Sequence, residues 1–188
     1  VTFDAGASLS GTTNFTVAAW VRTTATSAVA SLSVTVNGVA DTPVVAVAAA
    51  TGNEDSAIPL NITAALTDTD GSENLRSITI SGIPAGATLT TGTDNHVITV
   101  NADGIATLTS ADLANLKITP PANSDADFTL QVSATSSEGT TIATSAPVNL
   151  AVTVNAVADT PTVTVTAAAG AEDTNIPLNI SSALADAD

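Results

Sequence analysis

Carboxylates are the side chains of this chain that could do chemistry, and they gather around one stretch. Residues 53–73 hold five of them around an apolar segment: Glu54, Asp55, Asp68, Asp70 and Glu73. Asp-x-Asp before Gly can aim two carboxylates at one point, and Ca²⁺ takes six to eight such oxygens. The pattern is not an EF-hand, because the Gly comes too early and the twelve-residue loop is absent. It predicts a calcium site or, alternatively, a solvated acidic turn.

Further carboxylates flank predicted strands. Asp125 and Asp127 precede one strand, and Asp41 lies beside a Thr-Pro pair. Loops at one end of a β-sandwich converge, so we expect the pair at 54–55, the loop at 68–73 and a neighbouring aspartate to share one pole. Like charges so close would repel each other, which favours a bound cation.

Other kinds of site are not assembled in the sequence. His96 is the single histidine and has no cysteine beside it, which argues against zinc or a catalytic triad. Trp20 lies in an apolar strand and is interpreted as core. Three basic residues, Arg22, Arg76 and Lys117, are too scattered for a phosphate site. Paired carboxylates can hydrolyse glycosides, but here they lack aromatic subsites. We therefore expect no enzyme.

Composition excludes further partners. The chain of 188 residues has 3 Lys+Arg, 18 Asp+Glu and a net charge of −15, which argues against nucleic acid and anionic membrane surfaces. It has no cysteine, so bound metal is one remaining source of rigidity in a secreted protein. No apolar run approaches the roughly 18 residues of a spanning helix. We expect the chain to be a piece of a longer protein.

An internal repeat defines the domain organisation. Ala25–Asp70 aligns without gaps on Ala143–Asp188 at an offset of 118 residues, with 30 of 46 positions identical. Residues 41–158 are therefore expected to form one complete unit, residues 1–40 the end of a preceding unit, and residues 159–188 the start of the next. The joints at 37–43 and 155–161 carry Asp, Thr and Pro without a Gly/Ser tract, which favours stiff head-to-tail stacking.

Period-two patterns predict an all-β fold. Leu32, Val34 and Val36 alternate with Ser33 and Thr35, which is typical of a half-buried strand. Similar segments are expected at 15–22, 44–48, 58–62, 77–81, 88–90, 97–100, 117–119, 128–134 and 148–154. One helical turn is expected at 110–116. About seven strands per unit indicate an immunoglobulin-like or cadherin-like β-sandwich.

The order of these motifs resembles a known family. Val-Ala-Asp-Thr-Pro, Glu-Asp-x-x-Ile-Pro-Leu, Asp-x-Asp-Gly-Ser-Glu and the segments at 80–87, 109–113 and 118–123 are similar to the Ig-like, cadherin-like tandem repeats of giant type I-secreted (RTX) bacterial adhesins. The resemblance covers roughly residues 25–188. It implies secreted, cell-surface sandwiches that extend an adhesive tip and are rigidified by Ca²⁺ at their joints.

The resemblance also implies ligands. Asp41, Glu54, Asp55, Asp68 and Asp70 would lie near one joint. Their counterparts would repeat the arrangement at the next joint: Asp159, Glu172, Asp173, Asp186 and Asp188. The second set lacks Gly-Ser-Glu after its last aspartate.

The first 24 residues also resemble the opening strands of a laminin G-like, concanavalin A-like domain. The alternative is that they form end strands of a preceding sandwich, since residues 14–17 resemble residues 127–130 at an offset of 113.

Three functions follow from these interpretations. The first is a non-enzymatic, calcium-stiffened extender that contacts adjacent repeats and supports adhesion and biofilm formation. The second is a protomer of an extracellular filament built from like subunits by strand complementation. The third is a carbohydrate-binding module that rests on Trp20, with a glycan or cell-surface ligand.

Overall fold

The computed structural model describes residues 2, 4, 10–17 and 30–185. Seventeen elements follow in chain order: β1 Gly11–Val17, β2 Ala30–Val36, β3 Val44–Val47, β4 Ala50–Asn53, β5 Ile58–Pro59, β6 Ile62–Ala65, β7 Asn74–Ser81, β8 Thr88–Thr91, β9 His96–Ile98, β10 Ala106–Leu108, the 3₁₀ turn η1 Ala111–Leu113, β11 Lys117–Thr119, β12 Phe128–Glu138, β13 Thr141–Thr144, β14 Val148–Asn155, β15 Thr162–Thr166 and β16 Asn179–Ala183.

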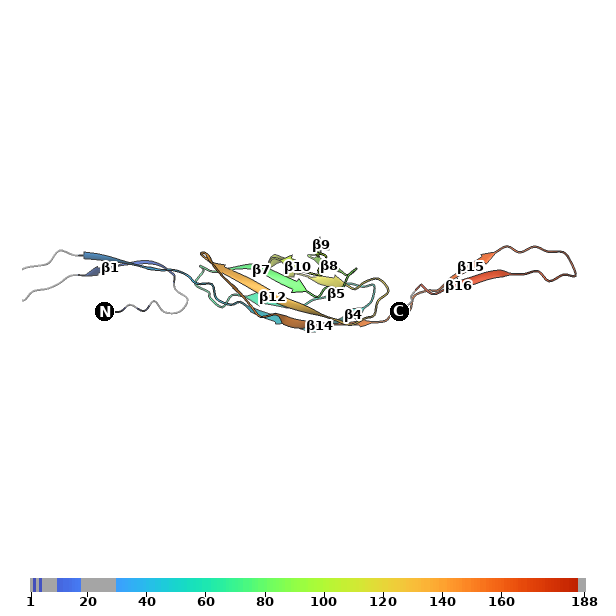
Figure 1. Ribbon diagram of the computed structural model, residues 1–188, viewed down its shortest axis with the longest axis horizontal. Helices are drawn as coiled ribbons and strands as arrows, with labels where there is room; N and C mark the ends of the chain where they lie inside the picture. Colours follow the sequence, from blue (N-terminus) through green and yellow to red (C-terminus); the bar gives the residue numbers. More distant parts are fainter. Residues whose placement is uncertain (1, 3, 5–9, 18–29, 186–188) are drawn as a thin grey trace, which may run out of the picture.

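Residues 41–158 form a two-layer β-sandwich at the centre of an elongated chain (Figure 1). One layer has the strand order β10-β7-β12-β14-β4, and β13 pairs with the C-terminal part of β12. The other layer holds β5-β11-β8-β9 and the pair β3-β6. The predicted all-β sandwich is thus confirmed.

The core is made by the inward positions of both layers. In β12, every second residue from Leu130 to Glu138 is buried, which is the period-two pattern of a strand with one covered face. Leu130 and Leu150 meet Ile58, Leu89 and Ile118 of the opposite layer in one cluster. In the core, strands from the first half of the unit therefore pack against its last strand, β14.

One predicted strand divides in two because it changes partner. Residues 58–62 were expected to be continuous, but β5 pairs with β11 and β6 pairs with β3. The change occurs at two backbone bonds: Leu60 donates its N–H to Leu116 O, and Asn61 O accepts the N–H of Ala48. The expected helical turn at 110–116 is the short 3₁₀ turn η1.

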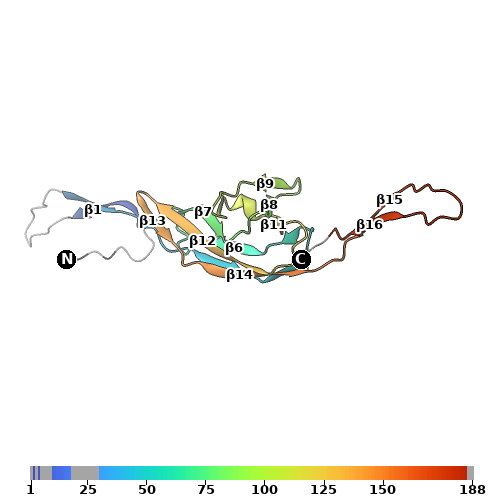
Figure 2. The same ribbon diagram turned by 45° about the vertical axis from the view of Figure 1, so that its right-hand side comes forward.

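Two hairpins extend from opposite ends of the sandwich (Figure 1, Figure 2). At one end, β1 pairs with β2. At the other end, β15 pairs with β16 in the register of β3 and β6 shifted by 118: Val47 lies opposite Ile62, and Val165 opposite Ile180. The expected strand at 15–22 begins earlier, at Gly11, and its residues beyond Val17 lie outside the described part.

Candidate functional site

The incoming pole is the end of the sandwich at which residues 37–43 join it. There the loop 66–73 and the turn between β12 and β13 surround the joint. The carboxylate of Glu73 accepts the N–H of Asp41 at 2.6 Å, and Ser136 donates its hydroxyl to Asp41 O, also at 2.6 Å. Ala40 N–H donates to Thr141 Oγ1 at 2.7 Å. The joint is thus fixed by side chains from the loop 66–73 and from the strands β12 and β13.

The outgoing pole is the opposite end, where residues 155–157 leave β14. Glu54 accepts the N–H of Val157 at 2.5 Å and donates its own N–H to Asn155 O. Asp55 has a left-handed backbone with φ 52° and accepts the N–H of Asn123 at 3.0 Å. Asp127 accepts the N–H of Val154 at 2.8 Å. Carboxylates therefore bind the backbone at this pole too.

The expectation that the 54–55 pair and the 68–73 loop share one pole is not met. From Asp41 the chain runs the length of the unit along β3 and β4 before it reaches Glu54. The strands β5 and β6 then bring it back to Asp68. The eleven residues of β12 span about 36 Å between Asp127 at one end and Glu138 at the other. The two sets can meet only across a joint, where the outgoing pole of one unit faces the incoming pole of the next.

Three carboxylates at the incoming pole are nearly inaccessible to solvent. Asp68, Glu73 and Glu138 are 4%, 5% and 5% exposed. Asp68 accepts the N–H of Asp70 at 2.9 Å, and Glu138 accepts the hydroxyl of Ser72 at 2.6 Å. Burying a carboxylate is costly unless it is hydrogen-bonded and neutralised.

Glu138 was not predicted. It ends the long strand β12, directly before Gly139, and its side chain covers Gly38, where a Cβ would lie 2.0 Å from its Oε1. Its burial was hard to predict from the sequence, because a glutamate beside a hairpin turn is ordinarily exposed. Only the return of the chain over Gly38 buries it.

Ser72 lies between two carboxylates. Its hydroxyl contacts Asp70 Oδ1 and also Glu138 Oε1. A hydroxyl has one proton, so it hydrogen-bonds only one of the two at a time. The Ser72 hydroxyl, with the N–H of Ser72 and that of Ser10, holds the pKa of Asp70 below its usual range. The arrangement presents more oxygen acceptors than donors, as a cation site does.

Two buried oxygens have no partner in the described part of the chain. They are Glu54 Oε2, at the outgoing pole, and Glu73 Oε2, at the incoming pole. In each glutamate the other oxygen takes a backbone N–H of a joint. The two basic side chains that the structure describes do not compensate them: Lys117 donates to Asn95, and Arg76 is exposed.

Within residues 2, 4, 10–17 and 30–185, no three carboxylates or histidines come together as ligands for one metal ion. The remaining predicted ligands are dispersed or outside this part. Asp125 precedes β12, Asp159 lies in the outgoing joint, and Glu172 and Asp173 are exposed on the loop after β15. Asp186 and Asp188 lie outside the described residues, but Asn123 Nδ2 of the outgoing pole donates to Ala185 O at 3.3 Å.

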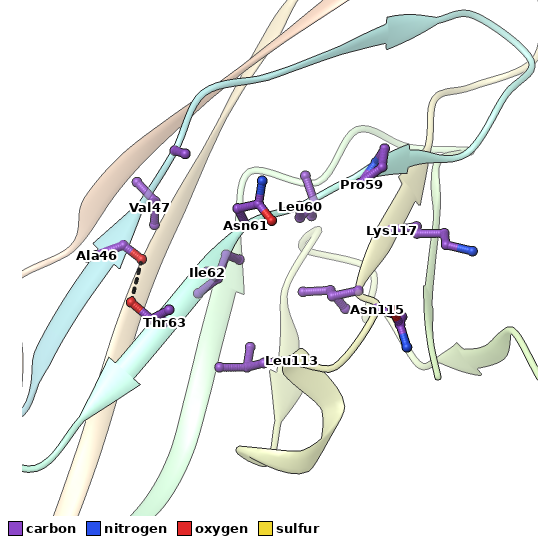
Figure 3. Close-up of a pocket in the computed structure, with 12 residues that line it drawn as sticks. Ala46, Val47, Pro59, Leu60, Asn61, Ile62, Thr63, Leu113, Asn115 and Lys117 are labelled. Atoms are coloured by element: carbon purple, nitrogen blue, oxygen red, sulfur yellow. Dashed lines mark hydrogen bonds between the residues drawn. The ribbon is translucent and has the colours of Figure 1, made fainter. Parts of the chain in front are cut away.

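An open groove of about 540 Å³ lies between the β3-β6 pair and residues 113–117 (Figure 3). Its lining is mainly apolar, and Lys117 is its one charged side chain. Thr63 donates its hydroxyl to Ala46 O at 3.5 Å on one wall. The residues that line the groove include neither paired carboxylates nor a nucleophile next to a base.

Neither His96 nor Trp20 contributes a side chain to the site described at either pole. His96 begins β9 and is exposed, on the strand that pairs with β8. Trp20 lies outside the described residues. In the described chain, no helix is long and apolar enough to cross a membrane.

Comparisons with protein-family models, with curated proteins and with solved structures give no match. What bears on function is therefore the geometry of the two poles and the repeat.

Proposed function

We propose that this chain is a non-enzymatic structural extender of a large secreted bacterial surface adhesin, in which Ca²⁺ stiffens the joints between successive sandwiches. It would act outside the cell, in adhesion and biofilm formation, with adjacent repeats of the same chain as its partners. A ligand for the whole adhesin would bind elsewhere.

One observation carries the proposal. Glu54 and Glu73 each hold a joint N–H with one oxygen and leave the other buried without a partner. Asp159 is the counterpart of Asp41, so in an array of these units each joint would be contacted from both sides. Glu54 of the preceding unit would accept the N–H of Val157, and the counterpart of Glu73 in the following unit would accept the N–H of Asp159. Two half-paired buried carboxylates that converge on one short segment favour a divalent cation between them.

The residues that would hold the ion come from both sides of the joint. The preceding unit contributes Glu54, Asp55 and Asp127, and the following unit contributes the counterparts of Asp68, Asp70 and Glu73. Calcium would neutralise these carboxylates and connect the two poles. The contact between Asn123 and Ala185, the residue before Asp186, supports such an approach of the two units. At the incoming pole, Glu138 and Ser72 supply further oxygens.

Thermal unfolding with Ca²⁺ and then with EGTA tests the calcium part. A ligand at about 100 times its dissociation constant stabilises the native state by about 2.7 kcal/mol, so the midpoint should rise clearly in calcium. Glu54→Gln and Asp186→Ala, one on each side of the joint at 155–161, should reduce the rise, whereas His96→Ala should leave it unchanged. An equal midpoint in calcium and EGTA would refute calcium binding.

Small-angle scattering tests the extender part separately. A stiff array should keep its maximum dimension in calcium, and EGTA should broaden the distribution of lengths as the joints loosen. A compact particle in calcium, with the hairpins folded onto the sandwich, would contradict an extender.

A further inference from the structure

One peptide bond of the incoming joint connects an asparagine to a glycine. Asn37-Gly38 is the only Asn-Gly pair in the sequence. The corresponding pair of the outgoing joint is Asn155-Ala156, and Val-Ala-Asp-Thr-Pro follows in both joints. The chain therefore contains a matched comparison for any property that depends on this glycine.

The packing of the incoming pole favours glycine at position 38. The side chain of Glu138 lies over it, and a Cβ added to Gly38 would come within 2.0 Å of Glu138 Oε1 and 2.2 Å of Glu138 Cδ. Glu138 is 5% exposed, and its carboxylate accepts the hydroxyl of Ser72 at 2.6 Å. A larger residue at position 38 would have to displace this buried, hydrogen-bonded side chain. The fold thus explains why Asn37 is followed by the residue with the least steric hindrance.

The asparagine of this pair is accessible to water. Asn37 is exposed, and with Gly38 and Glu138 it lines an open cavity of about 660 Å³ beside the incoming pole. Asn155, at the end of β14, is exposed as well, so exposure is common to both joints. The N–H of Gly38 donates to no residue that the structure describes. The backbone nitrogen that follows the Asn37 amide is therefore not held by a hydrogen bond within this part of the chain.

These features combine into a reactive pair. A backbone nitrogen can attack the side-chain carbonyl carbon of the preceding asparagine and close a succinimide ring. The ring closes most readily before glycine, because no Cβ hinders the approach and the backbone reaches conformations that other residues rarely adopt. Residues 37–43 lie outside the strands, so no ladder of hydrogen bonds fixes the backbone here.

We propose that Asn37 is a site of spontaneous deamidation that alters the incoming joint as the protein ages. The nitrogen of Gly38 loses its proton and bonds to Cγ of Asn37, the bond between Cγ and Nδ2 breaks, and Nδ2 leaves with that proton as ammonia. Water then opens the succinimide. Cleavage between the ring nitrogen and Cγ gives an ordinary aspartate, and cleavage between the ring nitrogen and the main-chain carbonyl carbon gives isoaspartate. Water is the only co-reactant.

Either product places a new carboxylate beside Glu138. The pole already buries three carboxylates, and like charges at short range repel each other. Isoaspartate also adds a methylene to the main chain, which displaces the residues that follow. The bonds affected are those from Ala40 N–H to Thr141 Oγ1 and from Asp41 N–H to Glu73. Deamidation should therefore loosen the incoming joint, and this effect requires neither calcium nor the proposed extender function.

Ageing of the full chain in EGTA at mildly alkaline pH, followed by peptide mass spectrometry, tests the site. Trypsin cleaves after the three basic residues, so Asn37 and Asn155 fall in separate peptides, 23–76 and 118–188. The gain in mass from amide to carboxyl, located by fragmentation, should appear at Asn37 roughly tenfold or more faster than at Asn155, since only Asn37 precedes glycine. The rate should rise with pH, because the attacking nitrogen must lose its proton.

The same ageing in urea separates a site of the native protein from one that reacts only in unfolded chains. The rate at Asn37 in the folded chain should lie within about tenfold of the rate in urea, since the fold leaves this pair open. Asn37→Gln keeps a side-chain amide but forms the larger ring far more slowly, and it is the control for the joint. Aged wild type should exchange the amide hydrogens of Ala40 and Asp41 faster than Asn37→Gln aged in the same way.

Three results would overturn the proposal. The first is an equal rate at Asn37 and Asn155, and the second is a gain in mass at Asn37 that appears only in urea. The third is a converted wild type whose amide exchange at Ala40 and Asp41 equals that of Asn37→Gln. All arms are run in EGTA, so none of these results bears on the melting experiment with calcium.

Discussion

Glu54 Oε1 accepts the N–H of Val157 at 2.5 Å, although the two residues are 103 positions apart. The bond connects the start of the unit to the segment through which the chain leaves it. Glu73 makes the matching bond to Asp41, the residue through which the chain enters. Each end of the sandwich thus holds its joint by a buried glutamate.

The first prediction concerns the charge of Glu54. Glu54→Gln keeps an acceptor for Val157 N–H but removes a buried charge whose Oε2 has no partner. In EGTA the variant should be as stable as the wild type or more stable, because burial penalises the charged form. In calcium it should be less stable, by about 1–3 kcal/mol, because one ligand charge is lost.

Glu172→Gln is the matched control for that variant. Glu172 occupies the same place in the second copy but is exposed. Its replacement should change the free energy of unfolding by less than about 0.5 kcal/mol in either buffer. Paired thermal melts in calcium and EGTA make the comparison, and equal effects at the two positions would contradict a special role of Glu54.

The second prediction compares two leucines of the repeat. Leu150 is fully buried, and its counterpart Leu32 is 55% exposed. Leu150→Ala should lower the free energy of unfolding by about 2–5 kcal/mol, since it leaves a cavity in the core. Leu32→Ala should cost less than about 1 kcal/mol. Urea unfolding of both variants measures the difference, and similar losses would contradict the arrangement of the core.

The third prediction concerns the bond between the sandwich and its incoming joint. Ser136 is fully buried and donates its hydroxyl to Asp41 O at 2.6 Å. Ser136→Ala should lower the free energy of unfolding by about 1 kcal/mol and speed amide hydrogen exchange near residue 41. Ser137→Ala, at the next position and on the opposite face of β12, should change neither quantity. Exchange that stays slow in Ser136→Ala would show that the bond does not hold the joint.

The fourth prediction concerns two carboxyl pKa values. The hydroxyl of Ser72 lowers the pKa of Asp70, and the hydroxyl of Thr109 lowers that of Asp112. Each contribution to stability is present above the ordinary value of 3.8 and is lost as the pH falls through the lower folded value. Carboxyl carbon NMR titration should show that Ser72→Ala raises the pKa of Asp70 but not that of Asp112, and that Thr109→Ala raises the pKa of Asp112 but not that of Asp70. A shift at both positions in either variant would contradict these local causes.

The local elements could largely be predicted from the sequence. The alternation around Leu32 and around Leu150 marks strands because an inward residue recurs at every second position. Asp112 binds Thr109 N–H at 2.8 Å, as the capping-box spacing of the two residues indicates. By contrast, β4 was not predicted. Among the residues that the structure describes, its partner is β14 alone, about 100 residues later, and the same segment of the second copy forms no strand there.

The candidate site likewise combines features that follow from the sequence with features that only the fold determines. The sequence by itself determined the all-β sandwich, the period of 118 residues and the carboxylates that repeat with it. Only the tertiary structure decided that Glu54 and Glu73 lie at opposite poles and that Glu138 joins the incoming pole. The physical reason is that strand patterns depend on neighbours in sequence, whereas burial depends on where the chain returns. Each of these carboxylates is buried by a segment far from it in sequence: Val157, Asp41 and Gly38.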